Sequence, residues 1–384
     1  MCVNNKIASN NSRILALFLF QYSLIIPITH YIENWLGVAI ISSVLLFLLF
    51  LKNIRNNINI APVLLLLLVF MYILTNTILL SGNIMNLLMF MTIAIPTSVV
   101  TMYKFNSDQF IKSCCSLAYV NFFINCFYPF IPGYAYMRFG YGMLITSVFL
   151  YIKIRNRYNL YGKQKRHDGI FDMIVLFLSL IEIFLFGARG AIFAFLLLLF
   201  LDLFISSKNI LRNIALSIVP LSLIAVSLEP VVNALVNFTK ANGYFSYTLF
   251  KIQMQLSYGI ENASSGRNTL YKKAIDGILE HPFLGRGIFL GDADSLYTHN
   301  LFLQVGNDLG VLPMCLLICF LIVILYEICS KKNPALDRVI LLALFSIAIG
   351  RLMFSSNIWL RPEFWLLTFV YISKKCSWLV NSKC

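Results

Sequence analysis

The feature that most constrains this chain is its succession of long apolar segments joined by short polar connectors. Of its 384 residues, 59% are hydrophobic and 12% are charged, whereas globular chains average about 25% charged residues. Runs of about 20 apolar residues are long enough for a helix to cross a bilayer. The sequence therefore predicts an all-α, polytopic transmembrane helical bundle, with residues 1–384 forming a single integral membrane domain.

Windows of high hydropathy predict about 12 spans. Lysine and arginine gather in alternate connectors, and the connectors between these are nearly bare. By the positive-inside rule, this alternation supports the same count and places both termini in the cytoplasm. It also accounts for the net charge of +14 without nucleic acid as a partner. The expected spans are about 14–31, 35–51, 60–80, 84–103, 111–130, 139–155, 170–187, 190–206, 210–228, 311–328, 336–354 and 357–373.

One long connector, residues 229–298, falls on the extracytoplasmic side. Apolar residues recur within it at helical spacing, opposite charged ones, which predicts an amphipathic helix of about three turns on the membrane surface or against the bundle. Ser264 or Ser265 is its expected N-cap and Pro282 its expected end. The apolar positions are Leu270, Tyr271, Ala274, Ile275, Ile278 and Leu279.

Two arginines at predicted membrane boundaries are candidates for a functional role. Arg189 lies in the turn between spans 170–187 and 190–206, where an arginine is costly unless it is paired or faces water. Arg267 lies at the start of the amphipathic helix, where exposed amides and a guanidinium suit a phosphate. The alternatives are an Arg189 that snorkels to the interface and an Arg267 that contacts lipid headgroups.

His299 is the sharpest candidate for proton transfer, because histidine is easily tuned near neutral pH. It lies where the long loop re-enters the membrane, followed by Asn300; a histidine at such a boundary is otherwise an interfacial side chain. Arg286 is flanked by Gly285 and Gly287. These glycines allow the backbone to approach a ligand, and they equally suit any tight turn.

Asp292 and Asp294 have the spacing of a divalent-cation pair. Two acids in a polar loop are usually just solvated, so neither a metal nor another cofactor is predicted. No phosphate-binding loop or nucleotide fold is recognisable in the sequence. A transferase that faces away from the cytoplasm has no supply of nucleotide sugars, so its donor would be linked to a lipid.

Together these motifs resemble the O-antigen polymerase and ligase superfamily of bacterial inner membranes. The resemblance covers about residues 170–330, and the first half of the chain agrees only in hydropathy and topology. The residues that carry it are Gly187–Ala191, Ser265–Arg267 with Leu270 and Tyr271, His281–Gly287, His299–Asn300 with Leu303, and Gly310.

The resemblance implies a metal-independent glycosyltransferase of the inner membrane that acts on undecaprenyl-diphosphate-linked oligosaccharides at the periplasmic face. It implies that Arg189 and Arg267 neutralise the leaving diphosphate, and that His299 acts as the base on the acceptor hydroxyl or orients it. Beside the lipid bilayer, a flippase and a chain-length regulator are the partners that it implies. The implied substrate contacts are Arg286, Asn300, Gly285, Gly287 and Tyr271.

The order of the motifs SGRNTLY, HPFLGRG and YTHN favours an O-antigen polymerase over a ligase, which would transfer the glycan to lipid A–core. Two other classes stay open: a flippase or other transporter of lipid-linked oligosaccharides, and a non-catalytic membrane protein. Transporters more often carry charged residues inside many spans and show repeat symmetry between halves. Here the functional candidates gather in one outer loop and no repeat is visible, which favours a transferase.

Overall fold

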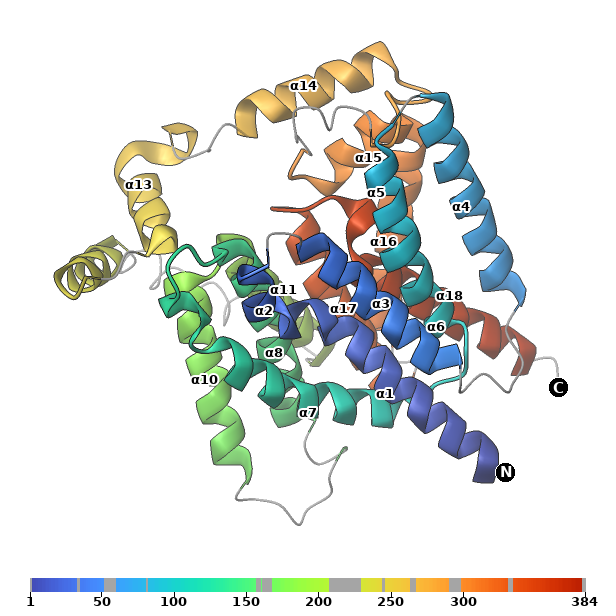
Figure 1. Ribbon diagram of the computed structural model, residues 1–384, viewed down its shortest axis with the longest axis horizontal. Coiled ribbons are helices and arrows are strands. Elements are labelled where there is room, and N and C mark those ends of the chain that lie inside the picture. Colours follow the sequence, from blue (N-terminus) through green and yellow to red (C-terminus); the bar gives the residue numbers. More distant parts are fainter. Residues whose placement is uncertain are drawn as a thin grey trace.

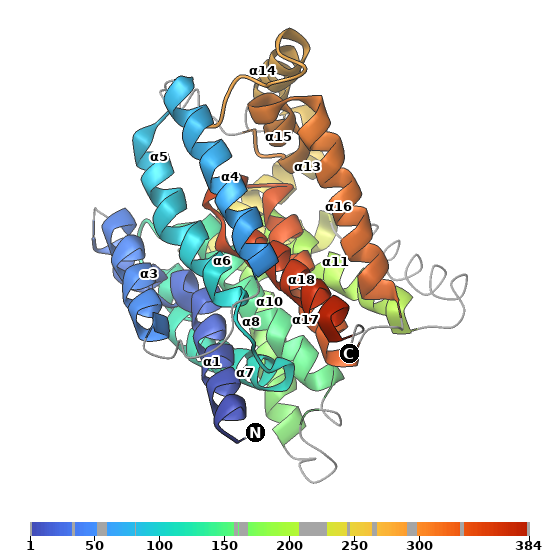
Figure 2. The same ribbon diagram turned by 90° about the vertical axis from the view of Figure 1, so that its right-hand side faces the viewer.

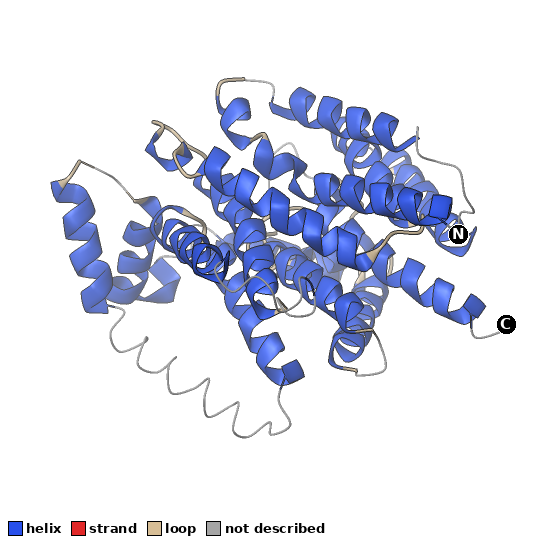
Figure 3. Ribbon diagram, turned by 90° about the horizontal axis from the view of Figure 1, so that it is seen from below, coloured by secondary structure: helices blue, strands red, loops and turns tan. Residues whose placement is uncertain are grey.

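The computed structural model describes residues 2–32, 35–51, 60–80, 82–156, 160, 168–206, 229–243, 246–262, 267–289, 298–330 and 334–381. In this part of the chain, the regular secondary structure is helical throughout and contains no strand (Figure 3). The prediction of an all-α chain is therefore confirmed. The predicted span 210–228, the serines at 264 and 265, and the acidic pair at 292 and 294 lie outside the described residues.

Helices follow one another through the described part of the chain (Figure 1). Every predicted span except 210–228 coincides with one or more of them, and residues 229–241 are also helical. The helices are α1 (Cys2–Leu24), α2 (Ile26–His30), α3 (Trp35–Leu51), α4 (Ile60–Leu79), α5 (Ile84–Met89), the π-helix η1 (Phe90–Ala94), α6 (Ile95–Thr101), α7 (Ser107–Asn125), η2 (Tyr128–Phe130), α8 (Tyr136–Arg155), α10 (Asp168–Phe186), α11 (Arg189–Ser206), α13 (Tyr247–Asn262), α14 (Arg267–Glu280), α15 (Leu301–Leu309), α16 (Val311–Cys329), α17 (Ala335–Leu352), η4 (Ile358–Leu360) and α18 (Pro362–Asn381).

Within the described residues, 6 helical segments are long and apolar enough to cross a membrane. They are Lys6–His30, Ile60–Leu79, Ile84–Thr101, Ser107–Phe130, Gly169–Phe186 and Val311–Cys329. The chain is thus a helical membrane protein with several spans. The larger count of twelve remains a prediction.

Burial divides the helices into a centre and a periphery. Residues 139–150 of α8 and 340–350 of α17 are buried without a break; α8 packs on α7 and α10, and α17 on α11 and α18. The outer helices instead expose large apolar side chains, such as Leu68 of α4 (68% exposed) and Leu312 of α16 (65% exposed). A continuous apolar surface of this kind is stable against lipid rather than water.

Ion pairs between lysines and buried acids mark one end of the bundle. At the end where α8 finishes, basic side chains pair with buried acids: Lys153 with Asp172 at 2.8 Å, and Lys374 with Asp337 at 2.7 Å. Both chain termini lie toward this end, and α14 lies across the opposite end (Figures 1 and 2). The paired lysines belong to connectors that the sequence places in the cytoplasm, and the candidate site lies at the far end of α8.

Candidate active site

The turn that carries Arg189 is seated directly on α8. A Cβ atom on Gly140 of α8 would lie 2.9 Å from the Gly187 Cα, and one on Gly190 would lie 2.8 Å from the Phe354 Cβ. Real Cβ atoms essentially never approach other atoms so closely, so only glycine lets the turn pack here. This packing fixes Arg189 as the first residue of α11.

Helix α13 holds the same turn from the other side. The Thr248 hydroxyl donates a hydrogen bond to the Gly187 carbonyl, and the Ser246 hydroxyl donates to the Leu185 carbonyl. The Arg189 guanidinium in turn donates to Oε1 of Gln255, on α13. Arg189 is therefore oriented by a polar partner rather than extended toward lipid headgroups.

Arg189, Arg267 and His299 meet in one pocket of about 150 Å³. Arg267 reaches it from the first position of α14, the predicted amphipathic helix, which runs to Glu280. Three residues that are far apart in sequence thus line one pocket, and the roles that the resemblance implies for them stay predictions. The pocket is lined by Tyr136, Met137, Arg189, Tyr247, Thr248, Lys251, Arg267 and His299.

The charge in this pocket is positive. Arg189, Lys251 and Arg267 line it, and no carboxylate is among the lining residues in the described part of the chain. Burial lowers the pKa of Arg189, and the nearby charge of Arg267 lowers it further. Crowded guanidinium groups with these neighbours favour a multiply charged oxyanion such as a phosphate.

The His299 imidazole is unprotonated at pH 7 and can therefore act as a base. Burial lowers the pKa of its imidazole to about 4, the positive charge of Arg267 acts in the same direction, and a hydrogen bond to the main chain of Phe354 opposes both. The ring is therefore neutral at pH 7 and able to accept a proton. Its backbone has a φ of 52°, in the left-handed region that few non-glycine residues adopt.

Asn300 fixes the position of His299 through the start of α15. Its side-chain oxygen accepts hydrogen bonds from the amides of Phe302 (3.0 Å) and Leu303 (3.1 Å), as an N-cap does. The cap gives Asn300 a structural role beside His299. The contact with substrate that the resemblance implies for Asn300 remains a prediction.

The structure separates Arg286 from this pocket. The amide of Arg286 donates to the Asn307 carbonyl at 2.7 Å, and its guanidinium pairs with Glu280. Gly285 has a φ of 67°, and the amide of Gly287 donates to the Asp308 carbonyl at 3.1 Å. These contacts join the turn to the end of α15, so the two glycines have a structural role in this turn.

Gly285 and Arg286 also line a different cavity of about 700 Å³, beside Tyr72 and Leu79 of α4. Tyr271 lies half-buried one turn into α14 and is not among the described residues that line the Arg189–His299 pocket. Substrate contacts by Arg286, Gly285, Gly287 and Tyr271 stay predictions.

Sequence reasoning missed the contribution of α13. Tyr247, Lys251 and Gln255 recur every fourth residue and so share one face of that helix. The rings of Tyr247 and Tyr136 lie 4.8 Å apart, and the Lys251 ammonium lies 5.4 Å from the Tyr247 ring centre. This polar stripe was visible in the sequence, but nothing there showed that it faces Arg189.

Residues 174–318 match the family model described as O-antigen ligase. The matched range contains Arg189, Arg267 and His299, together with α13 and α14. A search of curated proteins finds no match. Members of the matched family are membrane enzymes that transfer glycosyl groups. The match over residues 174–318 supports membership of the chain in the O-antigen polymerase/ligase superfamily.

Proposed function

We propose that this protein is an O-antigen polymerase. It transfers the growing glycan from undecaprenyl diphosphate onto a new lipid-linked repeat unit at the periplasmic face of the bacterial inner membrane. The observation that carries the proposal is the pocket in which Arg189, Arg267 and Lys251 surround a neutral His299.

The chemistry of the transfer fits this pocket. When the bond between the anomeric carbon and the lipid diphosphate breaks, negative charge develops on the leaving oxygen, and preorganised guanidinium groups stabilise it. The incoming sugar hydroxyl loses its proton as it forms the new glycosidic bond, and a neutral imidazole can take that proton. A single displacement of this kind inverts the configuration at the anomeric carbon. None of these steps uses a metal ion.

O-antigen ligase is the second candidate, because the matched family model carries that description. The two activities share the donor and differ in the acceptor, which is lipid A–core for a ligase. The order of the motifs around Arg267, Arg286 and His299 favours the polymerase.

Deletion of the gene in its host separates the candidates. For a polymerase, a polysaccharide gel should show lipid A–core carrying one repeat unit and no ladder of longer chains. Loss of every O-antigen band, including the single unit, identifies a ligase. Restoration of the ladder by the wild-type gene and not by His299→Ala ties the phenotype to this pocket.

A further inference from the structure

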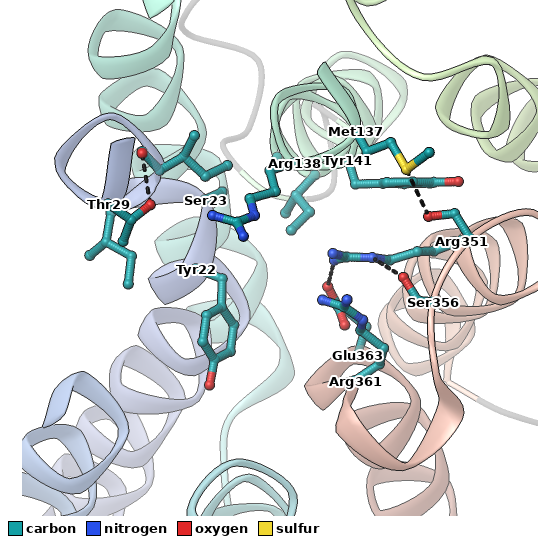
Figure 4. Close-up of a pocket in the computed structure, with 15 residues that line it drawn as sticks. Tyr22, Ser23, Thr29, Met137, Arg138, Tyr141, Arg351, Ser356, Arg361 and Glu363 are labelled. Carbon is teal, nitrogen blue, oxygen red and sulfur yellow. Dashed lines mark hydrogen bonds and ion pairs between the residues drawn. The ribbon is translucent and has the colours of Figure 1, made fainter. Parts of the chain in front are cut away.

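A second basic cavity, drawn in Figure 4, shares the lining residue Met137 with the Arg189–His299 pocket. Its volume is about 260 Å³, and it is enclosed by the ends of α1, α8, α17 and α18. Arg138 from α8, Arg351 from α17 and Arg361 just before α18 approach it from separate helices (Figure 4). None of these residues lies within residues 174–318, which match the family model.

Arg351 is held rigidly at the wall of this cavity. Its Nη1 donates to Oε1 of Glu363 at 2.5 Å, and its Nε donates to the Ser356 hydroxyl at 3.3 Å. The guanidinium carbon lies 5.0 Å from the centre of the Tyr141 ring, within the range of a cation–π contact. Such a side chain is preorganised and need not be reordered when a ligand binds.

Positive charge exceeds negative charge around the cavity. Three arginines line it, against the single carboxylate of Glu363 among the described lining residues. Burial lowers the pKa of Arg138, and the charge of Arg351 lowers it further. Guanidinium groups that converge with one carboxylate between them leave an excess that a bound phosphate would neutralise.

Glu363 lines this cavity and has one carboxylate oxygen that is buried without a partner in the described part of the chain. Its side chain is only 3% exposed, and its Oε2 has no hydrogen-bond partner among the described residues. A buried carboxylate oxygen is costly unless a donor reaches it. Sugar hydroxyls are donors of this kind.

The two basic cavities share a wall. Met137 lines both of them, and the Ser355 hydroxyl lies 3.8 Å from its sulfur. Phe354, the residue before Ser355, bonds His299 through its main chain. A glycan in the second cavity would therefore lie next to the base of the first.

We propose that the cavity lined by Arg138, Arg351, Arg361 and Glu363 binds the acceptor through a phosphate-bearing part of its glycolipid, while Arg189 and Arg267 hold the donor diphosphate. The assignment of the two cavities to acceptor and donor rests on the proposed function. A phosphate-bearing acceptor is either a second polyprenyl-diphosphate oligosaccharide or a phosphorylated lipid A–core, and both have the same binding chemistry.

The test is binding of inorganic pyrophosphate to the full-length protein in detergent, measured by isothermal titration calorimetry. The wild type should bind two pyrophosphates per chain, and Arg138→Gln/Arg361→Gln should bind one. Arg189→Gln/Arg267→Gln should retain the site that the first variant loses. Arg155→Gln, which removes an arginine paired with Asp202 at the opposite end of the bundle, should keep both sites. Each variant is checked first for monodisperse elution.

Two bound pyrophosphates in Arg138→Gln/Arg361→Gln, or a single wild-type site that only Arg189→Gln/Arg267→Gln removes, would overturn the second site and leave the proposed function standing. A single site that only Arg138→Gln/Arg361→Gln removes would instead count against the donor site and the proposed function.

Competition identifies the source of the acceptor. Displacement of pyrophosphate from the second site of Arg189→Gln/Arg267→Gln by undecaprenyl diphosphate supports a lipid-linked repeat unit, and displacement by lipid A supports a ligase-type acceptor. Displacement by neither overturns the assignment of this cavity to an acceptor.

Discussion

At the scale of single residues, the neutral state of His299 leads to a pH dependence. Because burial and Arg267 lower its pKa to about 4, the imidazole of the free enzyme stays unprotonated as the pH falls from 7 to about 5. The kcat/KM for polymerisation of lipid-linked repeat units from the host should therefore be flat over this range, and should fall only as the pH approaches 4. A decline centred near pH 6.5, the ordinary pKa of histidine, would contradict a buried base beside Arg267.

A substitution of His299 that tolerates its backbone conformation tests the catalytic role of the imidazole alone. His299→Asn should lower kcat by about 10²–10⁴-fold, the usual contribution of a general base. Asparagine tolerates the left-handed conformation at φ 52°, so the protein should be produced at wild-type levels. Near-normal turnover in this variant would show that His299 only fills space.

Arg189 and Arg286 form a matched pair, since both are arginines of glycine-containing turns and only Arg189 lines the His299 pocket. Arg189→Gln should lower kcat by about 10²–10³-fold, as loss of a transition-state donor does. Arg286→Gln should change kcat much less and should reduce stability instead, because it breaks the pair with Glu280. Equal losses of kcat in the two variants would instead indicate that Arg286 contacts the substrate.

At the scale of secondary-structure elements, the start of α15 separates two roles of Asn300. Aspartate caps a helix as well as asparagine does, whereas alanine costs about 0.5–2 kcal/mol. If the cap is the main role, Asn300→Asp should keep wild-type turnover and Asn300→Ala should lower both turnover and thermal stability. A comparable loss of turnover in both variants, with Asn300→Asp fully stable, would indicate a sugar contact. Thermal unfolding and polymerisation assays on the purified variants make this comparison.

Some helices could be predicted from the sequence, whereas some contacts between helices could not. Helix α14 was predictable, because its apolar residues and Pro282 define it locally. The meeting of α13 with the Arg189 turn was not, because it depends on hydrogen bonds from Ser246 and Thr248 to a turn about 60 residues earlier. Such partners have no local signature in the sequence.

At the scale of the whole molecule, hydropathy located the apolar helices of the described residues but did not predict which of them are buried. Two of the most apolar helices, α4 and α16, lie at the periphery, where lipid covers their leucines. The central α8 contains small and polar residues such as Gly140, Thr146 and Ser147, which allow neighbouring helices to approach closely. A ranking by hydrophobicity would therefore have put the centre of the bundle outside.

The described segments before and after residues 207–228 lie toward opposite ends of the bundle. Arg155 pairs with Asp202 near the end of α11, at the far end of α8 from Met137. Val232 and Val236 pack instead with Leu249 of α13, on the side of the candidate site. Residues 206 and 229 therefore lie toward opposite ends of the bundle. The predicted span 210–228 lies outside the described residues, and it has about the length of a helix that crosses a bilayer.

Reporter fusions test this crossing. Alkaline phosphatase fused after residue 206 should be inactive and after residue 243 active, because the enzyme folds only outside the cytoplasm. A fluorescent protein fused to the C-terminus should be bright, since both termini lie toward the end where Lys153 pairs with Asp172. Equal phosphatase activity at the two junctions would contradict the prediction that residues 210–228 cross the membrane. Inverted signals at all three positions would place the Arg189–His299 pocket in the cytoplasm, where flipped lipid-linked repeat units are absent.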